Sequence, residues 1–212
     1  MGKASLSVDE TVTMMVAVAD KIIASEPVLT DADRALGDGD HGVGMERGMK
    51  AVKEKLAEGG FATVDKVFIA VGGAMMSSMG GASGAIFGTL FRAGGKGIGA
   101  REQFDAEAVA QLLDAGCEGV MKRGGANPGD KTMVDALDPA RKKAVELRDT
   151  ALDAALDAVA GAAEAGRDAS EGMIATMGRA KTLGEGSLGK PDAGAVSVAI
   201  IMRAMADFVA NA

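Results

Sequence analysis

With 212 residues, the chain is close in size to one globular domain, since domains average roughly 150 residues, and we predict a single domain over residues 1–212. A net charge of −7 and the absence of Trp and Tyr exclude the basic, aromatic surface that nucleic acids need. Apolar runs far shorter than the roughly 20 residues of a bilayer span argue against a membrane protein. The lone Cys117, with no signal peptide before it, predicts a reducing, cytoplasmic location.

Apolar residues recur at three- and four-residue spacing along most of the chain, and no stretch alternates convincingly at period two. The 48% hydrophobic content is mainly aliphatic residues and methionine, which favours helix over sheet. We predict an all-α fold, an antiparallel up-and-down bundle or barrel of eight helices. In chain order, the helices are expected at about 8–25, 45–56, 63–79, 83–91, 105–120, 131–148, 150–177 and 193–209.

Local signals set the expected ends of several helices. Ser7 and Glu10 form a capping box before the first helix, and Pro27 is expected to end it. Ser83 is expected to cap the fourth helix, which the glycines between 94 and 99 are expected to break.

In such a bundle, every connection from an odd helix to the next even helix falls at the same end. These four loops are residues 31–42, 80–84, 123–132 and 178–194, and they hold the only histidine, two of the four prolines and paired aspartates. Each leads into a helix N-terminus, where free N–H groups and the helix dipole favour anions. Glycine in these loops allows a ligand to approach the backbone closely. We therefore predict a nucleotide site at this end of the bundle.

Three aspartates of the first loop, Asp33, Asp38 and Asp40, are candidate metal ligands. Carboxylate oxygens suit Mg²⁺, especially when the ion also binds substrate phosphates. Three carboxylates beside a polyphosphate would repel it unless divalent cations lay between them, so the metal and phosphate hypotheses support each other. The alternative is a solvated acidic loop that only caps the next helix. An EF-hand is excluded, because Gly42 and Met49 would occupy its ligand positions.

Other common site motifs are absent from the sequence. Gly94-Gly95-Lys96 lacks the upstream glycine and the following hydroxyl residue of a P-loop, and no G-x-S-x-G elbow accompanies His41. Cys117 lies among apolar residues at helical spacing and is expected in the core.

The four loops carry an ordered set of motifs: D-R-A-L-G-D-G-D-H-G at 33–42, G-G-A-S-G at 80–84, P-G-D-K-T-M at 128–133 and G-R-A at 178–180. In this order and spacing the chain resembles the nucleotide-binding L subunits of the dihydroxyacetone kinase family over essentially its whole length. The resemblance implies an eight-helix barrel that binds ADP or ATP at one end through two Mg²⁺ held by Asp33, Asp38 and Asp40. It also implies nucleotide contacts from His41, Gly42, Val43, Gly44, Ala82, Ser83, Gly124, Met133, Arg179, Asp192, Ala193 and Gly194.

The chain departs from the family pattern in its last loop. Gly184-Glu185-Gly186-Ser187 stands where the family usually has Gly-Glu-Arg-Ser. Ala193 replaces a usual proline, and Lys190 replaces a usual histidine. Because the missing arginine removes a charge from the loop that closes over the nucleotide, we expect altered contacts there, including contacts with a partner.

The resemblance implies a phosphotransferase that moves the terminal phosphoryl group of a Mg-nucleotide to a short ketose held on a separate K subunit. Two donors stay open: ATP that exchanges in each cycle, and a retained ADP that a phosphohistidine carrier of the sugar phosphotransferase system rephosphorylates. Dihydroxyacetone and a tetrulose both stay open as substrates, and a homodimer stays open as the oligomeric state. The alternative function is a non-catalytic, nucleotide-sensing protein that acts on a regulatory partner.

Overall fold

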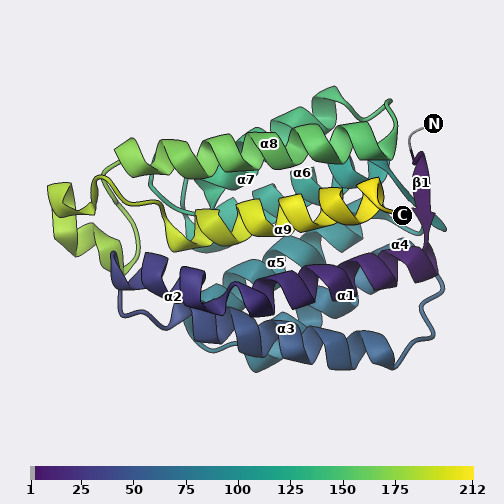
Figure 1. Cartoon of the computed structure of the whole chain (residues 1–212), viewed down its shortest axis with the longest axis horizontal. Coiled ribbons are helices and arrows are strands. Elements are labelled where there is room, and N and C mark those ends of the chain that lie inside the picture. The colour runs from purple at the N-terminus through teal and green to yellow at the C-terminus, as the bar shows by residue number, and fades with distance from the viewer. Residues whose placement is uncertain (1–2) are drawn as a thin grey trace.

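The computed structural model describes residues 3–212, which form a helical barrel (Figure 1). Its α-helices are α1 (Val8–Ala24), α2 (Glu26–Arg34), α3 (His41–Ala57), α4 (Val64–Ser78), α5 (Gly81–Ile98), α6 (Ala106–Gly124), α7 (Val134–Glu146), α8 (Leu152–Ala169) and α9 (Ala193–Ala210). Two 3₁₀ segments, η1 (Ser170–Gly172) and η2 (Arg179–Ser187), precede α9, and two short strands, β1 (Ser5–Ser7) and β2 (Gln103–Asp105), pair antiparallel. The predicted all-α class is confirmed.

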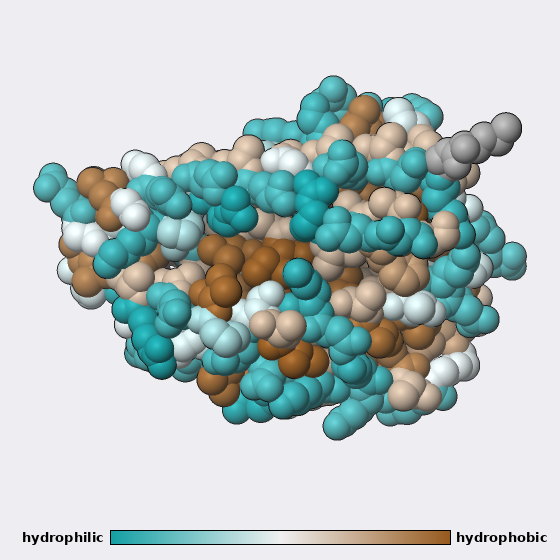
Figure 2. All heavy atoms as spheres, viewed as in Figure 1, coloured by the Kyte–Doolittle hydropathy of each residue, from teal (hydrophilic) through white to brown (hydrophobic). Residues whose placement is uncertain are grey.

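Eight of these helices run alternately up and down and close into a ring. Each packs against its neighbours in the order α1, α3, α4, α5, α6, α7, α8 and α9, and α9 returns to α1. The side chains that face inward form one continuous core of Met, Leu, Val, Ala and Phe, in which Phe68 packs between Phe91 and Phe104. Figure 2 shows polar side chains over much of this face of the molecule, with apolar side chains gathered near its middle, around α9.

The prediction missed α2, the short helix that lies outside this ring. Pro27 was expected to end the first helix, but it lies in the first turn of α2, where the missing N–H of proline costs no helical hydrogen bond. The chain turns at Ser25 and α2 then packs against α3. The aspartate loop is therefore shorter than the sequence suggested, and it begins at the end of a helix.

The prediction that glycines break the fourth helix was also wrong, because α5 runs on to Ile98. A Cβ atom on Gly94 would lie 2.5 Å from the Leu112 carbonyl oxygen, and one on Gly95 would lie 2.9 Å from the Asp65 carbonyl oxygen. These glycines let α5 approach α6 and α4 closely. Gly99, with φ of 68°, ends the helix.

Other boundaries shift for local reasons. Gly80, not Ser83, is the N-cap of α5, and α8 ends at Ala169, so the expected helix over 150–177 is too long. The two three-residue strands were missed because they are too short to show a period. The expected capping box of Ser7 and Glu10 is present at α1.

The structure contains one helix, α9, that is long and apolar enough to cross a membrane. Its mean hydropathy is 1.7, but 67% of it is buried inside the barrel. Its composition is therefore that of a core helix, as its contacts with α1, α7 and α8 indicate.

Candidate functional site

The four loops predicted to share one end of the bundle do so, at the left of Figure 1. They surround a cavity of about 640 Å³ that is lined by residues from the α2–α3 loop, the start of α5, the α6–α7 loop and the segment before α9. The joins at the other end, such as residues 58–63 and 147–151, are ordinary short connections. The site thus lies where several helices begin and their N–H groups are available.

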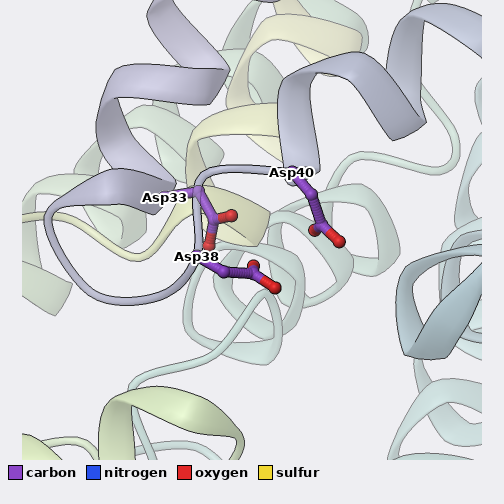
Figure 3. Close-up of side chains that lie close together, drawn as sticks. All are labelled: Asp33, Asp38 and Asp40. Atoms are coloured by element: carbon purple, nitrogen blue, oxygen red, sulfur yellow. The ribbon is translucent and has the colours of Figure 1, made fainter.

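Asp33, Asp38 and Asp40 line this cavity and lie close together (Figure 3). Each offers a carboxylate oxygen within 4.8 Å of those of the other two. Asp33 comes from the last turn of α2, and its Oδ2 accepts a hydrogen bond of 3.2 Å from the backbone N–H of His41. Asp40 is the N-cap of α3, but its side chain makes no capping hydrogen bond and stays directed toward the other two (Figure 3).

Glycine shapes the loop that carries these carboxylates. A Cβ atom on Gly37 would lie 2.6 Å from Oδ1 of Asp33, so the loop wraps closely around that carboxylate, and Gly39 has a φ of 77° that other residues rarely adopt. Three hard oxygen donors in one loop form a donor set suited to Mg²⁺. Glycine at 37 and 39 therefore allows the backbone conformation that brings the carboxylates together.

The predicted residues 41–44 form the first turn of α3 and differ in their surroundings. His41 lines the cavity, whereas Gly42 is buried against α2, where a Cβ atom would lie only 2.4 Å from the carbonyl oxygen of Glu26. Val43 is half exposed, and Gly44 has open space beside it. Gly42, Val43 and Gly44 therefore have only backbone groups to offer a ligand in the cavity.

The His41 ring links three helices. Its Nε2 lies 2.8 Å from the Ser197 hydroxyl of α9, its Nδ1 lies 3.4 Å from the Ser83 hydroxyl of α5, and the ring packs against Phe87. Burial lowers the pKa of His41, although Asp33 and nearby Asp40 oppose the shift. A neutral imidazole at pH 7 suits this structural role.

One wall of the cavity is apolar. Ile86 and Phe87 of α5, Val120 of α6, and Met133 face the cavity together with Met177. Sequence reasoning selected Met133 and the neighbouring Gly124, but it assigned the other wall positions to the core or to no site. Their helical spacing is that of core residues, so no sequence signal separated them. A flat, uncharged group such as a nucleobase suits such a wall.

Arg179 and residues 192–194 also line the cavity. Nη1 of Arg179, at the start of η2, lies 2.8 Å from Oδ2 of Asp38. Asp192 caps α9 by accepting a 2.8 Å hydrogen bond from the Ala195 N–H, and Ala193 and Gly194 follow it into the helix. Burial raises the pKa of Asp192 to about 6.

Ala82 and Ser83 line the cavity at the beginning of α5. The backbone before them has a positive φ of 68° at Gly81, which also lines the cavity. Sequence reasoning missed Lys131, which also lines the cavity although only 2% of it is exposed. Lys131 belongs to the P-G-D-K-T-M motif at 128–133, but nothing in that motif indicates that its side chain is buried.

A cluster of carboxylates, several helix N-termini and an apolar wall in one cavity define a class: helical proteins that bind a metal and a phosphate compound at one end of a barrel. The sequence matches the DAK2 domain family over residues 35–207, and the chain belongs to this family.

Relatives and solved structures agree with this assignment. The chain is 36% identical over 204 residues to the "PEP-dependent dihydroxyacetone kinase, ADP-binding subunit DhaL" of Escherichia coli, covering 95% of this chain and 97% of that one. It is 34% identical over 189 residues to the L-erythrulose 1-kinase of Mycolicibacterium smegmatis, covering 86% of this chain and 32% of that one. The crystal structure of the dihydroxyacetone kinase from C. freundii in complex with AMP-PNP and Mg²⁺ superposes with a TM-score of 0.71 at 25% identity, covering 98% of this chain and 35% of that one.

Proposed function

We propose that this chain is the nucleotide-binding phosphotransfer subunit of a short-ketose kinase and that it works in the cytoplasm with a separate ketose-binding subunit. One observation carries the proposal: three carboxylates converge beside helix N-termini in a cavity that also has an apolar wall. Family membership and the similarity to an ADP-binding subunit over nearly its full length support it.

Each part of the cavity has a role in this proposal. Asp33, Asp38 and Asp40 hold two Mg²⁺, and when bound these ions supply positive charge that neutralises the phosphates and orients them. The first turn of α3, residues 41–44, borders the phosphates, and the N–H groups of Gly42, Val43, Ala82 and Ser83 bind phosphate oxygens. Gly124 and Met133 hold the nucleoside part beside the apolar wall.

Arg179 and the start of α9 complete the enclosure. The Arg179 guanidinium pairs with Asp38, one of the proposed metal ligands, so it lies close to the proposed phosphate site. There its charge stabilises a transferring phosphoryl group. Asp192, Ala193 and Gly194, which line the cavity, border the nucleotide. The phosphoryl acceptor is a hydroxyl of a ketose, which the partner subunit presents.

Reconstitution tests this function. The purified chain is mixed with a K-type ketose-binding subunit, and phosphorylation of dihydroxyacetone and of erythrulose is measured with ATP and with a phosphorylated carrier protein as donors. We expect transfer from one donor and none when either subunit is omitted. No transfer in any combination, with tight binding of Mg·ADP retained, would favour the nucleotide-sensing protein.

Whether the purified protein retains nucleotide distinguishes the two possible donors. ADP that survives extensive dialysis would indicate a retained cofactor that a phosphocarrier recharges on the protein. A protein free of nucleotide after desalting would indicate exchange of ATP for ADP in each cycle.

A further inference from the structure

The segment of residues 170–192, between α8 and α9, forms one side of the proposed nucleotide site. In Figure 1 it projects from the end of the barrel in yellow-green. Much of its bonding is internal: Ser187 Oγ accepts from the Ala175 N–H and donates to the Gly184 carbonyl oxygen. Its polar contacts with the barrel are few: Thr176 bonds to Asp130, Arg179 pairs with Asp38, Lys190 reaches the Ala35 carbonyl, and Lys131 contacts the two ends of the segment.

Lys131, from the α6–α7 loop, makes the contacts that join both ends. Its Nζ donates to the carbonyl oxygen of Ser170 at 2.6 Å and to that of Lys190 at 2.7 Å. The Lys131 side chain is buried, and Ser170 is fully buried. One ammonium group thus ties both ends of the segment to the loop between α6 and α7. It adds to the bonds that the ends make with each other, from the Gly189 N–H to the Glu171 carbonyl and from the Asp192 N–H to Ser170 Oγ.

The backbone at Lys131 is fixed in an unusual conformation. Its φ of 60° makes it the one non-glycine residue with a positive φ in the described part of the chain. Asp135 holds the turn on both sides, because its carboxylate accepts hydrogen bonds from the N–H groups of Gly129 and Thr132. A strained backbone that persists under such constraint is typical of functional positions.

Three carboxylates favour the charged form of the ammonium, against the effect of burial. Burial lowers the pKa of Lys131, but the carboxylates of Asp192, Glu171 and Asp135 oppose this shift. Hydrogen bonds from a charged donor to carbonyl oxygens are stronger than neutral ones. Removing the ammonium would leave the Ser170 carbonyl buried without this donor.

We propose that Lys131 is a positioning residue that clamps the base of the 170–192 segment and thereby sets how long the nucleotide stays bound. The proposal rests on the proposed nucleotide-binding function. The segment carries Arg179 and Asp192, so release of its base loosens one wall of the cavity at both of these residues. A lysine that instead binds phosphate directly would leave the segment unchanged in the absence of nucleotide.

Two substitutions and one control test the clamp. Lys131→Met keeps the length of the side chain but not its charge, and Lys131→Asn suits a left-handed backbone without reaching the carbonyls. Lys142→Met is the control, because Lys142 is exposed and pairs with Asp138 on α7. Dissociation of a fluorescent ADP analogue in the presence of Mg²⁺ and hydrogen exchange of residues 173–189 without nucleotide are measured for each.

We expect dissociation at least tenfold faster and exchange in 173–189 at least tenfold faster in both variants, with exchange in α3–α6 unchanged and the control like wild type. Unchanged exchange without nucleotide would overturn the clamp even if affinity fell, since that pattern is the one for direct phosphate binding. Failure of wild type to bind Mg·ADP would instead contradict the proposed function. If neither variant folds, exchange in the wild type decides: residues 173–189 must open independently of the barrel, and opening only with global unfolding overturns the proposal.

Discussion

The two ends of the barrel solve the same problem, how to satisfy helix termini, in different ways. At the end away from the cavity, Ser7 and Glu10 cap α1 with groups three residues apart, and Asp105 caps α6 through the Ala108 N–H. At the cavity end, Lys131 reaches across the fold to Ser170 and Lys190. Asp192 caps α9 locally at this end too, but the N-caps of α3 and α5, Asp40 and Gly80, make no side-chain capping bond, so the N–H groups of these two helices stay available to a ligand.

The two ends also differ in how they shift the pKa of a carboxylate. Hydrogen bonds from Lys3 and Ser7 hold the pKa of exposed Glu10 at about 2, whereas burial raises the pKa of Asp192 to about 6. A carboxylate is thus stabilised as an anion at one end and destabilised at the other. Ionised Asp192 therefore lowers the stability of the folded protein at the cavity end, whereas ionised Glu10 raises it at the opposite end.

The largest expected effect follows from removing an aspartate of the cavity. Asp38→Ala and Asp40→Ala should weaken Mg²⁺-dependent ADP binding by at least about 100-fold, or about 2.7 kcal/mol, because each removes a proposed metal ligand. Isothermal titration calorimetry measures the affinity, and circular dichroism checks that the helices persist. Asp31→Ala is the matched control, since Asp31 lies on α2 but pairs with Arg34. Wild-type affinity in both variants would contradict the ligand assignment.

Ligand binding should stabilise the folded protein only when both parts of the site are filled. A ligand that binds only the native state at about 100 times its Kd adds about 2.7 kcal/mol to the free energy of unfolding. We expect this gain with ADP and Mg²⁺, and much less with ADP and a chelator, as measured by thermal unfolding. Equal shifts in the two conditions would show that phosphate binding does not need the metal.

The pH dependence of stability should differ in sign between the two carboxylates. Because the folded pKa of Asp192 is raised, its favourable contribution is complete below pH 4 and is lost as the pH rises through about 6. Relative to Asp192→Asn, which keeps a capping side chain, wild type should lose about 2 kcal/mol of unfolding free energy between pH 4 and pH 7. Urea unfolding at several pH values measures this.

Glu10→Gln supplies the comparison for that series. The folded pKa of Glu10 is lowered, so its contribution is present above pH 4.5 and is lost as the pH falls toward 2. The difference between wild type and Glu10→Gln should therefore shrink on acidification. Slopes of the same sign for both residues would refute the contrast between the two ends.

The smallest expected effect lies in the capping box. Ser7→Ala should lower the free energy of unfolding by about 1 kcal/mol, because the Glu10 N–H loses its side-chain acceptor. Mg·ADP affinity should stay within twofold of wild type, since Ser7 lies at the far end of the barrel. Thr13→Ala, on the exposed face of the same helix, is the control. A comparable loss of nucleotide affinity would mean that the two ends are coupled.

Local chemistry in the sequence determined much of this fold. The capping box of Ser7 and Glu10 and the helical spacing of apolar residues predicted where α1, α6 and α9 begin, because these signals act within one or two turns. The alternation of helix direction then indicated which four loops share an end. Asp33, Asp38 and Asp40 lie within eight residues of one another in the chain, so their convergence could also be expected from the sequence.

Only the tertiary structure decided what depends on contacts between distant segments. Gly94 and Gly95 have the composition of a helix break, yet α5 continues because α6 and α4 occupy the space of their missing side chains. Val120 has the spacing of a core residue, yet it faces a cavity. Lys131 resembles any loop lysine in sequence, and its role emerges only when Ser170 and Lys190 are brought to its ammonium group. Such close approaches and buried hydrogen bonds join residues far apart in the chain, so no local pattern encodes them.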